Sequence, residues 1–175
     1  MSPLAVTIRP ARVADAPVLA AAERAIAQTP GFLISQPHEL LDADFAQKIA
    51  ALAGTDNGRY LVAESDGAVV GHAMLDPMAR AAVRHVVHLT IAVHPGWQGR
   101  GVGRALLTSL IAWARGAPAV DVIELHVRSS NVAAQALYRK LGFTEVGRWF
   151  RRVKLGPGQY FDEVAMELWV GDALD

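Results

Sequence analysis

The sequence predicts an α/β (α+β) fold in which helices flank a mixed, partly parallel central sheet. Its predicted elements follow the order β-α-α-β-β-β-α-β-α-β-β. Two helices in the second half connect strands as crossovers, and such connections place parallel neighbours inside a sheet. In the first half, the dipeptide Asp66-Gly67 joins two β-rich segments as an antiparallel hairpin. With 175 residues, 52% of them hydrophobic, we expect residues 1–175 to form a single domain.

The first half of the chain is expected to contain two helices and four strands. In the first helix, Val18, Leu19, Ala22 and Ile26 recur at helical spacing, and Thr29–Phe32 ends it. The second helix ends before Gly54. The expected helices are Ala14–Gln28 and His38–Leu52, and the expected strands are Ala5–Arg9, Arg59–Glu64, Ala68–Leu75 and Arg84–Val93.

The second half is expected to alternate helices with strands and to close with a hairpin. A helix over Gly101–Arg115 carries an apolar stripe of Val102, Leu106, Leu110 and Trp113, with Ala105 beside it. A strand over Val122–Arg128 follows, and then a helix from Asn131 that Gly142 closes. The final hairpin consists of Glu145–Leu155 and Gln159–Val170, joined by Gly156-Pro157-Gly158.

Composition restricts the class of protein. The 17 basic and 17 acidic side chains balance, which argues against broad binding to nucleic acid or to a membrane surface. The absence of cysteine excludes disulfides, thiolate metal sites and cysteine nucleophiles. The N-terminal sequence lacks a basic segment followed by a long apolar one, and no apolar run approaches the roughly 20 residues that span a bilayer. We therefore expect a cytoplasmic protein with no nucleic-acid or membrane partner.

The stretch "IAVHPGWQGRGVGRALL" places closely spaced glycines between a strand and a helix. Unpaired amides at a helix N-terminus favour an anion, and glycine lets a phosphate approach the backbone. The stretch does not fit the G-x-G-x-x-G dinucleotide fingerprint, and the chain has no Gly-Lys dipeptide for a P-loop. The alternative is a glycine-rich turn without a ligand, but one glycine would be enough for a turn.

Two blocks of the sequence resemble a known family. "QGRGVG" (Gln98–Gly103) is similar to the Q/R-x-x-G-x-G/A signature of the GNAT superfamily of acetyltransferases, and "RSSNVAAQALYRKLGF" is similar to its Asn…Tyr…GF segment. The first half resembles the family only in element order. The C-terminal "GPGQYFDEVAMEL" resembles the final hairpin of bacterial amino-acid and phosphinothricin-type acetyltransferases.

The resemblance implies an N-acetyltransferase that uses acetyl-CoA as cosubstrate and whose sheet is splayed at the acetyl-CoA strand. The pantetheine arm would pair with the strand that contains Ile91 and Val93, like an added strand. Family analogy also implies a possible homodimer. The pyrophosphate would lie on the loop formed by Gln98, Gly99, Arg100, Gly101, Val102, Gly103 and Arg104.

Asn131, Gln135 and Tyr138 lie at i, i+4 and i+7 and so share one stripe of the last helix. By the resemblance, Tyr138 is the general acid at the sulfur and Asn131 contacts pantetheine. From the residues alone, Asn131 could serve only as a helix cap, and Tyr138 could be a half-buried aromatic with its hydroxyl in water. We expect the adjacent buried stripe to consist of Ala133, Ala136, Leu137 and Leu141.

Several residues are candidates for the base that deprotonates the amine. His85 and His88 point to opposite faces of one strand, and His85 shares a face with Val87, Leu89, Ile91 and Val93. Glu124 and His126 on the next strand are alternatives, acting through water. Each histidine could instead be structural or solvated. No third ligand has convincing spacing to the histidine pair, so we predict no metal site.

The acceptor is expected to be a small-molecule amine, held between the first two helices and the last hairpin. Arg148, Arg151 and Arg152 could bind its carboxylate or form a solvated basic face. Two other functions stay open: a protein acetyltransferase acting on an N-terminus or a lysine, and a non-catalytic acyl-CoA sensor. The aromatic residues Phe32, Trp149, Phe150, Tyr160 and Phe161 could shape the pocket or belong to the core.

Overall fold

The computed structural model describes residues 6–30 and 32–172. Its strands are β1 (Thr7–Pro10), β2 (Arg59–Ser65), β3 (Ala68–Pro77), β4 (Val86–Val93), β5 (Val122–Arg128), β6 (Thr144–Gly156) and β7 (Gln159–Trp169). Its α-helices are α1 (Ala16–Ala27), α2 (Asp42–Ala53), α3 (Val102–Arg115) and α4 (Val132–Lys140). Three short 3₁₀ turns cover η1 (Val13–Asp15), η2 (Pro37–Glu39) and η3 (Ala81–Val83).

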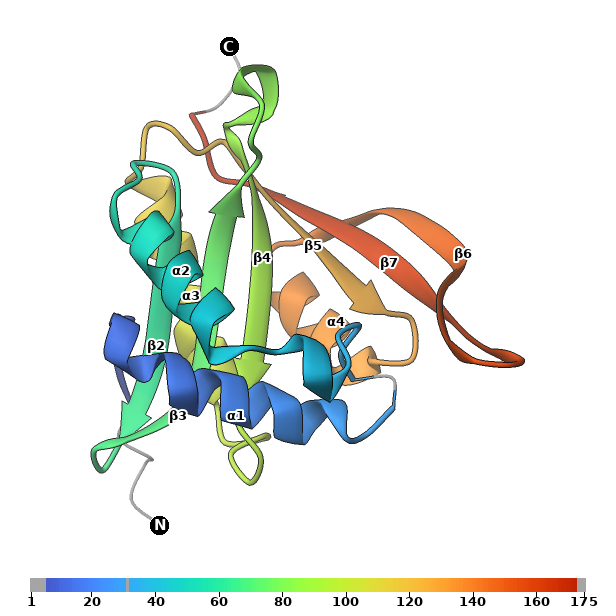
Figure 1. Ribbon diagram of the computed structural model, residues 1–175. Coiled ribbons are helices and arrows are strands. Elements are labelled where there is room, and N and C mark those ends of the chain that lie inside the picture. The colour runs from blue at the N-terminus through green and yellow to red at the C-terminus, as the bar shows by residue number, and fades with distance from the viewer. Residues whose placement is uncertain (1–5, 31, 173–175) are drawn as a thin grey trace.

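The strands form one sheet in the order β1-β2-β3-β4-β5-β7-β6. Every neighbouring pair is antiparallel except β4 and β5, which are parallel (Figure 1). The predicted mixed, partly parallel sheet is confirmed, with a single parallel pair at its centre. At the Asp66-Gly67 turn both residues have positive φ, at 50° and 78°, which is the geometry of a two-residue hairpin loop.

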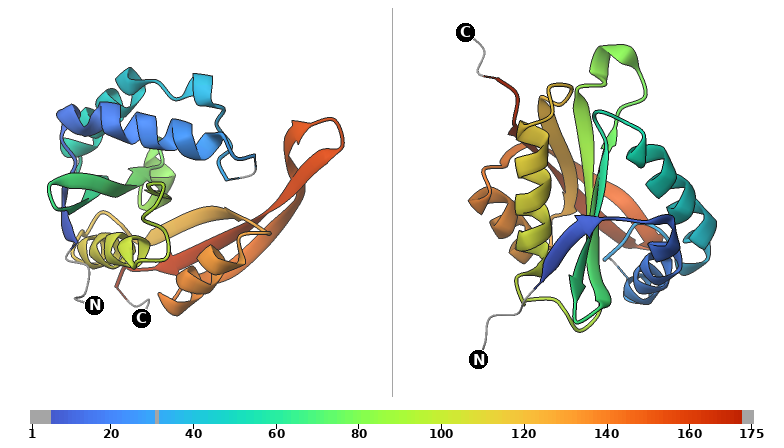
Figure 2. Two further views of the ribbon diagram at one scale, coloured as in Figure 1. Left: turned by 90° about the horizontal axis from the view of Figure 1, so that it is seen from below. Right: turned by 90° about the vertical axis from the view of Figure 1, so that its left-hand side faces the viewer.

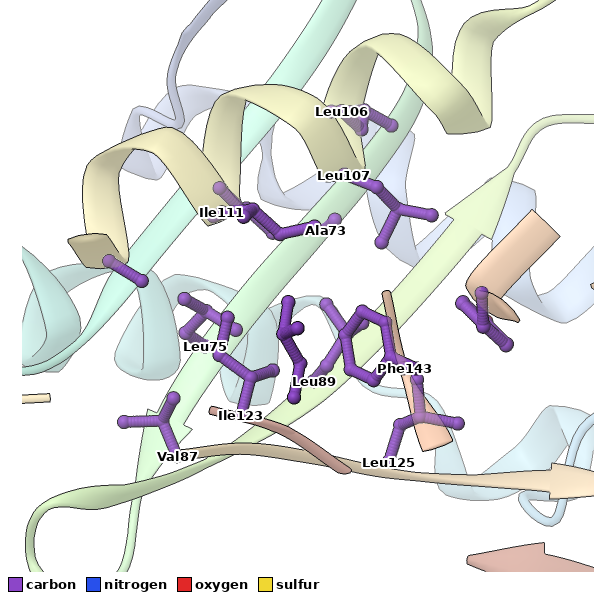
Figure 3. Packing of buried hydrophobic residues seen from close by; sticks show 14 of the residues in the cluster. Ala73, Leu75, Val87, Leu89, Leu106, Leu107, Ile111, Ile123, Leu125 and Phe143 are labelled. Atoms are coloured by element: carbon purple, nitrogen blue, oxygen red, sulfur yellow. The ribbon is translucent and has the colours of Figure 1, made fainter. Parts of the chain in front are cut away.

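Helices cover both faces of the sheet, α1 and α2 on one and α3 and α4 on the other (Figure 2). The larger core lies under α3 and α4, where side chains such as Leu75, Leu106 and Ile123 are almost completely buried (Figure 3). The smaller core lies under α1 and α2 and includes Leu19 and Val62. Within the described ranges, no helix combines the length and the apolar character needed to cross a membrane.

Several predicted boundaries were wrong in the first half. The second helix was expected from His38 but begins at Asp42, because Pro37–Glu39 forms a separate 3₁₀ turn and Leu41 is extended. β4 was expected from Arg84 but begins at Val86. In α1, Val18 faces solvent with 42% of its surface exposed, while Leu19 and Ala22 are buried as expected. Ala5, expected in the first strand, lies outside the described residues.

Candidate active site

The parallel pair β4–β5 separates along its length. It is paired only through Val86–His88 and Val122–Glu124. Beyond this point β4 stays paired with β3 as far as Val93, and β5 stays paired with β7 as far as Arg128. Among the described strands, none pairs with the edge of β4 that faces β5 beyond His88. An unpaired strand edge presents N–H and C=O groups that an extended ligand can bond.

The loop after β4 leads directly into α3. Gly96, Gly99 and Gly101 have φ values of 82°, 72° and 85°, a left-handed conformation that disfavours other residues. Gly101 is the N-cap of α3, whose first bond runs from the Ala105 N–H to the Gly101 carbonyl at 3.0 Å. The amides that precede this bond have no acceptor within the helix. They therefore form a site at the positive end of the helix dipole.

Polar side chains anchor this loop to β4 and place positive charge beside it. Gln98 Nε2 donates to the Val93 carbonyl at 3.0 Å and so ties the loop to the end of β4. The Arg100 guanidinium lies 5.1 Å from the centre of the Trp97 ring. Arg100 and Arg104 are both exposed, so they add positive charge beside the helix N-terminus.

The last helix, α4, presents the predicted polar stripe, but of its predicted buried stripe only Leu137 and Leu141 pack against the core. Asn131 caps the helix by accepting from the Ala134 N–H at 3.1 Å. Gln135 and Tyr138 are the buried residues of α4, whereas Ala133 and Ala136 are exposed. Gln135 is buried because its Nε2 donates to two carbonyls at the end of β5, of Arg128 and Ser129. A hydrogen-bonded glutamine thus takes the inner position expected for small apolar residues.

A cavity of about 870 Å³ joins these parts. It is lined by predicted cofactor residues of β4, the loop and α4, namely Ile91, Val93, Gln98, Gly99, Gly101, Gly103, Arg104, Asn131 and Tyr138. Its other wall comes from α1 and the segment after it, with Ala25, Ile26, Thr29, Phe32 and Leu33. Two predicted cofactor residues, Arg100 and Val102, are not among the residues that line the cavity, and Val102 is only 1% exposed.

Tyr138 is placed between the core and the cavity. Its side chain is 8% exposed, more buried than the half-buried alternative, and its ring packs against Phe143 at 5.7 Å between centroids. Burial raises the pKa of Tyr138 to about 12. The phenol is therefore protonated at neutral pH and can act as a proton donor but not as a base.

Three of the candidate base residues meet where β4 and β5 separate. They lie on the face of the sheet that points away from the core under α3 and α4. His88 Nδ1 lies 3.5 Å from Glu124 Oε1. The His126 ring lies 5.0 Å from the His88 ring and 4.5 Å from the ring of Trp149 on β6, edge to face in both cases. Burial and the charge of His88 lower the pKa of His126. Among the described residues, those lining the 870 Å³ cavity do not include this cluster.

Sequence reasoning placed His88 and Glu124 as alternatives, not as partners. Their pairing follows from the parallel register His88↔Glu124, which no pattern within one strand reveals. His126 follows Glu124 by two residues. Because alternate residues of a strand point to the same face, the sequence already indicated that both side chains share one face of β5. His85 lies in a turn before β4, and its carbonyl accepts from the Asp121 N–H at 2.9 Å. The structure does not bring His85 to the cavity, because its lining on β4 starts at Ile91.

The hairpin residues considered for the acceptor lie on β6 and β7. The guanidinium of Arg151 stacks over Tyr160 at 5.8 Å, and that of Arg152 over Trp149 at 5.4 Å. Arg148 Nη2 lies 3.8 Å from Glu145. Of the five aromatic residues considered, Phe32 lines the cavity, and Phe150 on the hairpin is 76% exposed.

Comparison with known proteins gives a consistent set of matches. The acetyltransferase (GNAT) family matches residues 24–143 of the chain. The N-alpha-acetyltransferase RimI of Mycobacterium tuberculosis is 43% identical over 99 residues, covering 54% of this chain and 60% of that protein. The L-amino acid N-acetyltransferase AaaT of Escherichia coli is 36% identical over 115 residues, covering 66% of this chain and 70% of that protein. The chain therefore spans 60% to 70% of the length of these two relatives.

Solved structures match over nearly the whole chain. A GNAT superfamily phosphinothricin acetyltransferase from Sinorhizobium meliloti, in complex with acetyl-CoA, superposes with a TM-score of 0.85 and 25% sequence identity. The match covers 95% of this chain and 89% of that structure. The fold described above is therefore shared along the length of both chains.

Proposed function

Because the chain belongs to the acetyltransferase (GNAT) family, we propose that it transfers an acetyl group from acetyl-CoA to the primary amine of a small molecule, such as an amino acid. One observation carries this proposal. A single cavity joins the glycine loop, the unpaired edge of β4 and the buried phenol of Tyr138. These are the three features that a thioester donor with a pyrophosphate and an amide-bearing arm requires. We further propose that residues 1–175 work as one acetyltransferase domain.

The chemistry of the site suits acetyl-CoA. The amides of Gly99–Arg104 lie at a helix N-terminus, which favours binding of the pyrophosphate. The exposed Arg100 and Arg104 add positive charge that neutralises the phosphates. The edge of β4 around Ile91–Val93 offers backbone bonds to the amides of the pantetheine arm. Leu137 and Val93 contribute apolar side chains to the lining of the same cavity.

The donor group, when bound, supplies an activated acetyl carbonyl and a thiolate leaving group. The incoming amine forms a C–N bond to the acetyl carbon while the C–S bond breaks, so one proton must leave nitrogen and one must reach sulfur. Tyr138 holds a proton at its Oη on the cavity wall and donates it, as a hydrogen bond or by transfer, to the sulfur. Asn131 lines the same cavity while its side chain caps α4.

His88 is the base that this geometry favours. It lies where the paired strands part, and its Nδ1 is 3.5 Å from Glu124 Oε1. Imidazole is the side chain most often used as a general base in enzymes. Neither histidine is among the described residues that line the cavity, but His88 lies at the last paired position of β4, where the strands part, whereas His85 lies in the turn before the strand.

A small acceptor is favoured over a protein acceptor by the acceptor side of the cavity. Phe32 and Leu33 line the cavity together with Ile91 and Val93 of β4, and this largely apolar lining suits a compact amine more than an extended peptide. The L-amino acid N-acetyltransferase relative supports this choice. The N-alpha-acetyltransferase relative keeps a protein N-terminus as the second candidate.

The test is release of free CoA thiol from acetyl-CoA in the presence of three acceptor classes. The panel contains free amino acids, amine drugs and short peptides with free N-termini. We expect the fastest release with a free amino acid or another small amine. Faster release with peptides would favour the protein acetyltransferase. Acetyl-CoA binding without turnover on any class would contradict the proposal and support a sensor.

A further inference from the structure

Three side chains with metal-ligating atoms meet where β4 and β5 separate: His88, Glu124 and His126. One ligating atom of each lies within 4.8 Å of the others, and His88 Nδ1 is 3.5 Å from Glu124 Oε1. Two ligands of a tetrahedral zinc ion, each bound at about 2.0–2.1 Å, lie about 3.3 Å apart. We propose that these three side chains bind one Zn²⁺ ion, with His126 turning inward to complete the set.

The backbone fixes this juxtaposition. His88 and Glu124 are direct partners in the parallel register, and His126 follows Glu124 by two residues on the same face of β5. Trp149 packs edge-on against the His126 ring from β6, so that a third strand supports the cluster. Ligands carried on paired strands keep their spacing better than ligands on a loop.

Charge and ligand type also favour a cation of this class. Glu124 is the direct partner of Glu167 in the antiparallel pair β5–β7, which places two carboxylates opposite each other on one face. Like charges in this arrangement destabilise a sheet, and a bound cation relieves the repulsion. Two imidazoles and one carboxylate suit zinc, whereas magnesium and calcium prefer oxygen ligands. The exposure of His126 leaves the fourth position open to water or to a ligand.

Zinc at this site has a consequence for catalysis. With zinc on Nδ1, the neutral imidazole of His88 keeps its proton on Nε2 and has no free lone pair, so it could not accept the proton that the proposed function assigns to it, and acetyl transfer would be inhibited. The inhibition rests on the proposed function, but the binding does not.

Binding is tested with metal-free protein and two probe ions. Zn²⁺ is titrated by calorimetry, and Co²⁺ by its visible absorption bands. We expect one equivalent to bind. Since loss of outer-shell partners alone weakens metal affinity by about 10–100-fold, His126→Ala and Glu124→Gln should each weaken binding at least about tenfold. His38→Ala, which removes an exposed histidine on η2, is the matched control and should bind as the unmodified protein does.

Equal Zn²⁺ affinity in the cluster variants and the unmodified protein, or no binding by the unmodified protein, would overturn the site. Inhibition is measured separately. For each protein, the rate of CoA release with Zn²⁺ present is divided by the rate of the same protein with a chelator present. We expect the unmodified protein to be inhibited and His126→Ala to be less sensitive. Undiminished turnover with zinc bound through the cluster would overturn the inhibitory role. If zinc binds through the cluster but the protein acetylates no acceptor, the proposed function is refuted and the metal site is not.

Discussion

Tyr138 is the single residue whose replacement most directly separates chemistry from binding. We expect Tyr138→Phe to lower kcat at least about 100-fold, the usual contribution of a positioned acid, because the proton donor at the sulfur is lost. The affinity for acetyl-CoA should change little, since the ring and its contact with Phe143 remain. Steady-state kinetics and calorimetry measure the two quantities.

A matched control for this substitution is Tyr160→Phe, which removes an exposed hydroxyl from the final hairpin. It should leave kcat unchanged. A large loss of acetyl-CoA affinity in Tyr138→Phe would mean that the phenol binds the coenzyme and does not act at the sulfur. Because its pKa is about 12, ionisation of Tyr138 should not shape the rate profile below about pH 10.

A buried chain of hydrogen bonds links α1 to the start of the glycine loop. His94 Nδ1 lies 3.0 Å from the Val69 carbonyl and must donate to it, because a carbonyl only accepts. His94 Nε2 lies 3.0 Å from His72 Nδ1, and His72 Nε2 lies 2.8 Å from Glu23 Oε1. With His94 neutral, its Nε2 accepts from His72. Protonation of His94 Nε2 would remove that acceptor.

His94 therefore makes stability depend on pH. Burial first, and the charge of His72 second, lower its pKa from 6.5 to about 4 in the folded state. As the pH falls below 6.5, the unfolded chain takes up the proton first, so the stabilisation is complete above pH 6.5 and is lost towards pH 4. We expect a loss of roughly 3 kcal/mol over this window.

Urea unfolding at several pH values measures the His94 effect. His94→Asn is the comparison, because its amide can still donate to the Val69 carbonyl but does not titrate. The free energy of unfolding of His94→Asn should fall less between pH 6.5 and pH 4 than that of the unmodified protein. Parallel pH profiles for the two proteins would contradict this account.

At the scale of elements, the loop between β4 and α3 carries the cofactor proposal. Gly101→Val should weaken acetyl-CoA binding, because a branched side chain disfavours the left-handed φ of 85° and displaces the amides at the start of α3. Gly96→Val is the matched control. It has a similar φ of 82° in the same loop but does not line the cavity.

Both valine variants should lose comparable stability, about 1–2 kcal/mol, because both force a β-branched residue into the left-handed region. Only Gly101→Val should lose acetyl-CoA affinity, as measured by calorimetry on the folded variants. Equal affinity for the two variants would show that the amides near Gly101 do not hold the coenzyme.

Element positions were predictable wherever local patterns were strong. Val122–Arg128 was predicted with the bounds that β5 has, and Gly142 ends α4 with a φ of 99°. The inner face of α4 was not predictable in the same way. Gln135 is buried only because two carbonyls at the end of β5 lie within its reach, and that is a tertiary contact.

At the scale of the whole molecule, the proposed site depends on one irregularity of the sheet. The family resemblance implied a splayed strand, and the register shows where the separation starts, just after His88 and Glu124. Local sequence patterns cannot locate this point, because it depends on how two strands from different parts of the chain pair. The same is true of the cluster of His88, Glu124 and His126, because the sequence offered Glu124 and His126 only as alternative bases and predicted no metal site.

The most direct test of the account is a crystal structure of this protein with acetyl-CoA. We predict pyrophosphate oxygens within about 2.7–3.2 Å of the backbone nitrogens of 99–104, and the sulfur beside the Tyr138 hydroxyl between the parting strands. Acetyl-CoA bound elsewhere, with the amides of this loop bonded to the protein itself, would contradict the central claim.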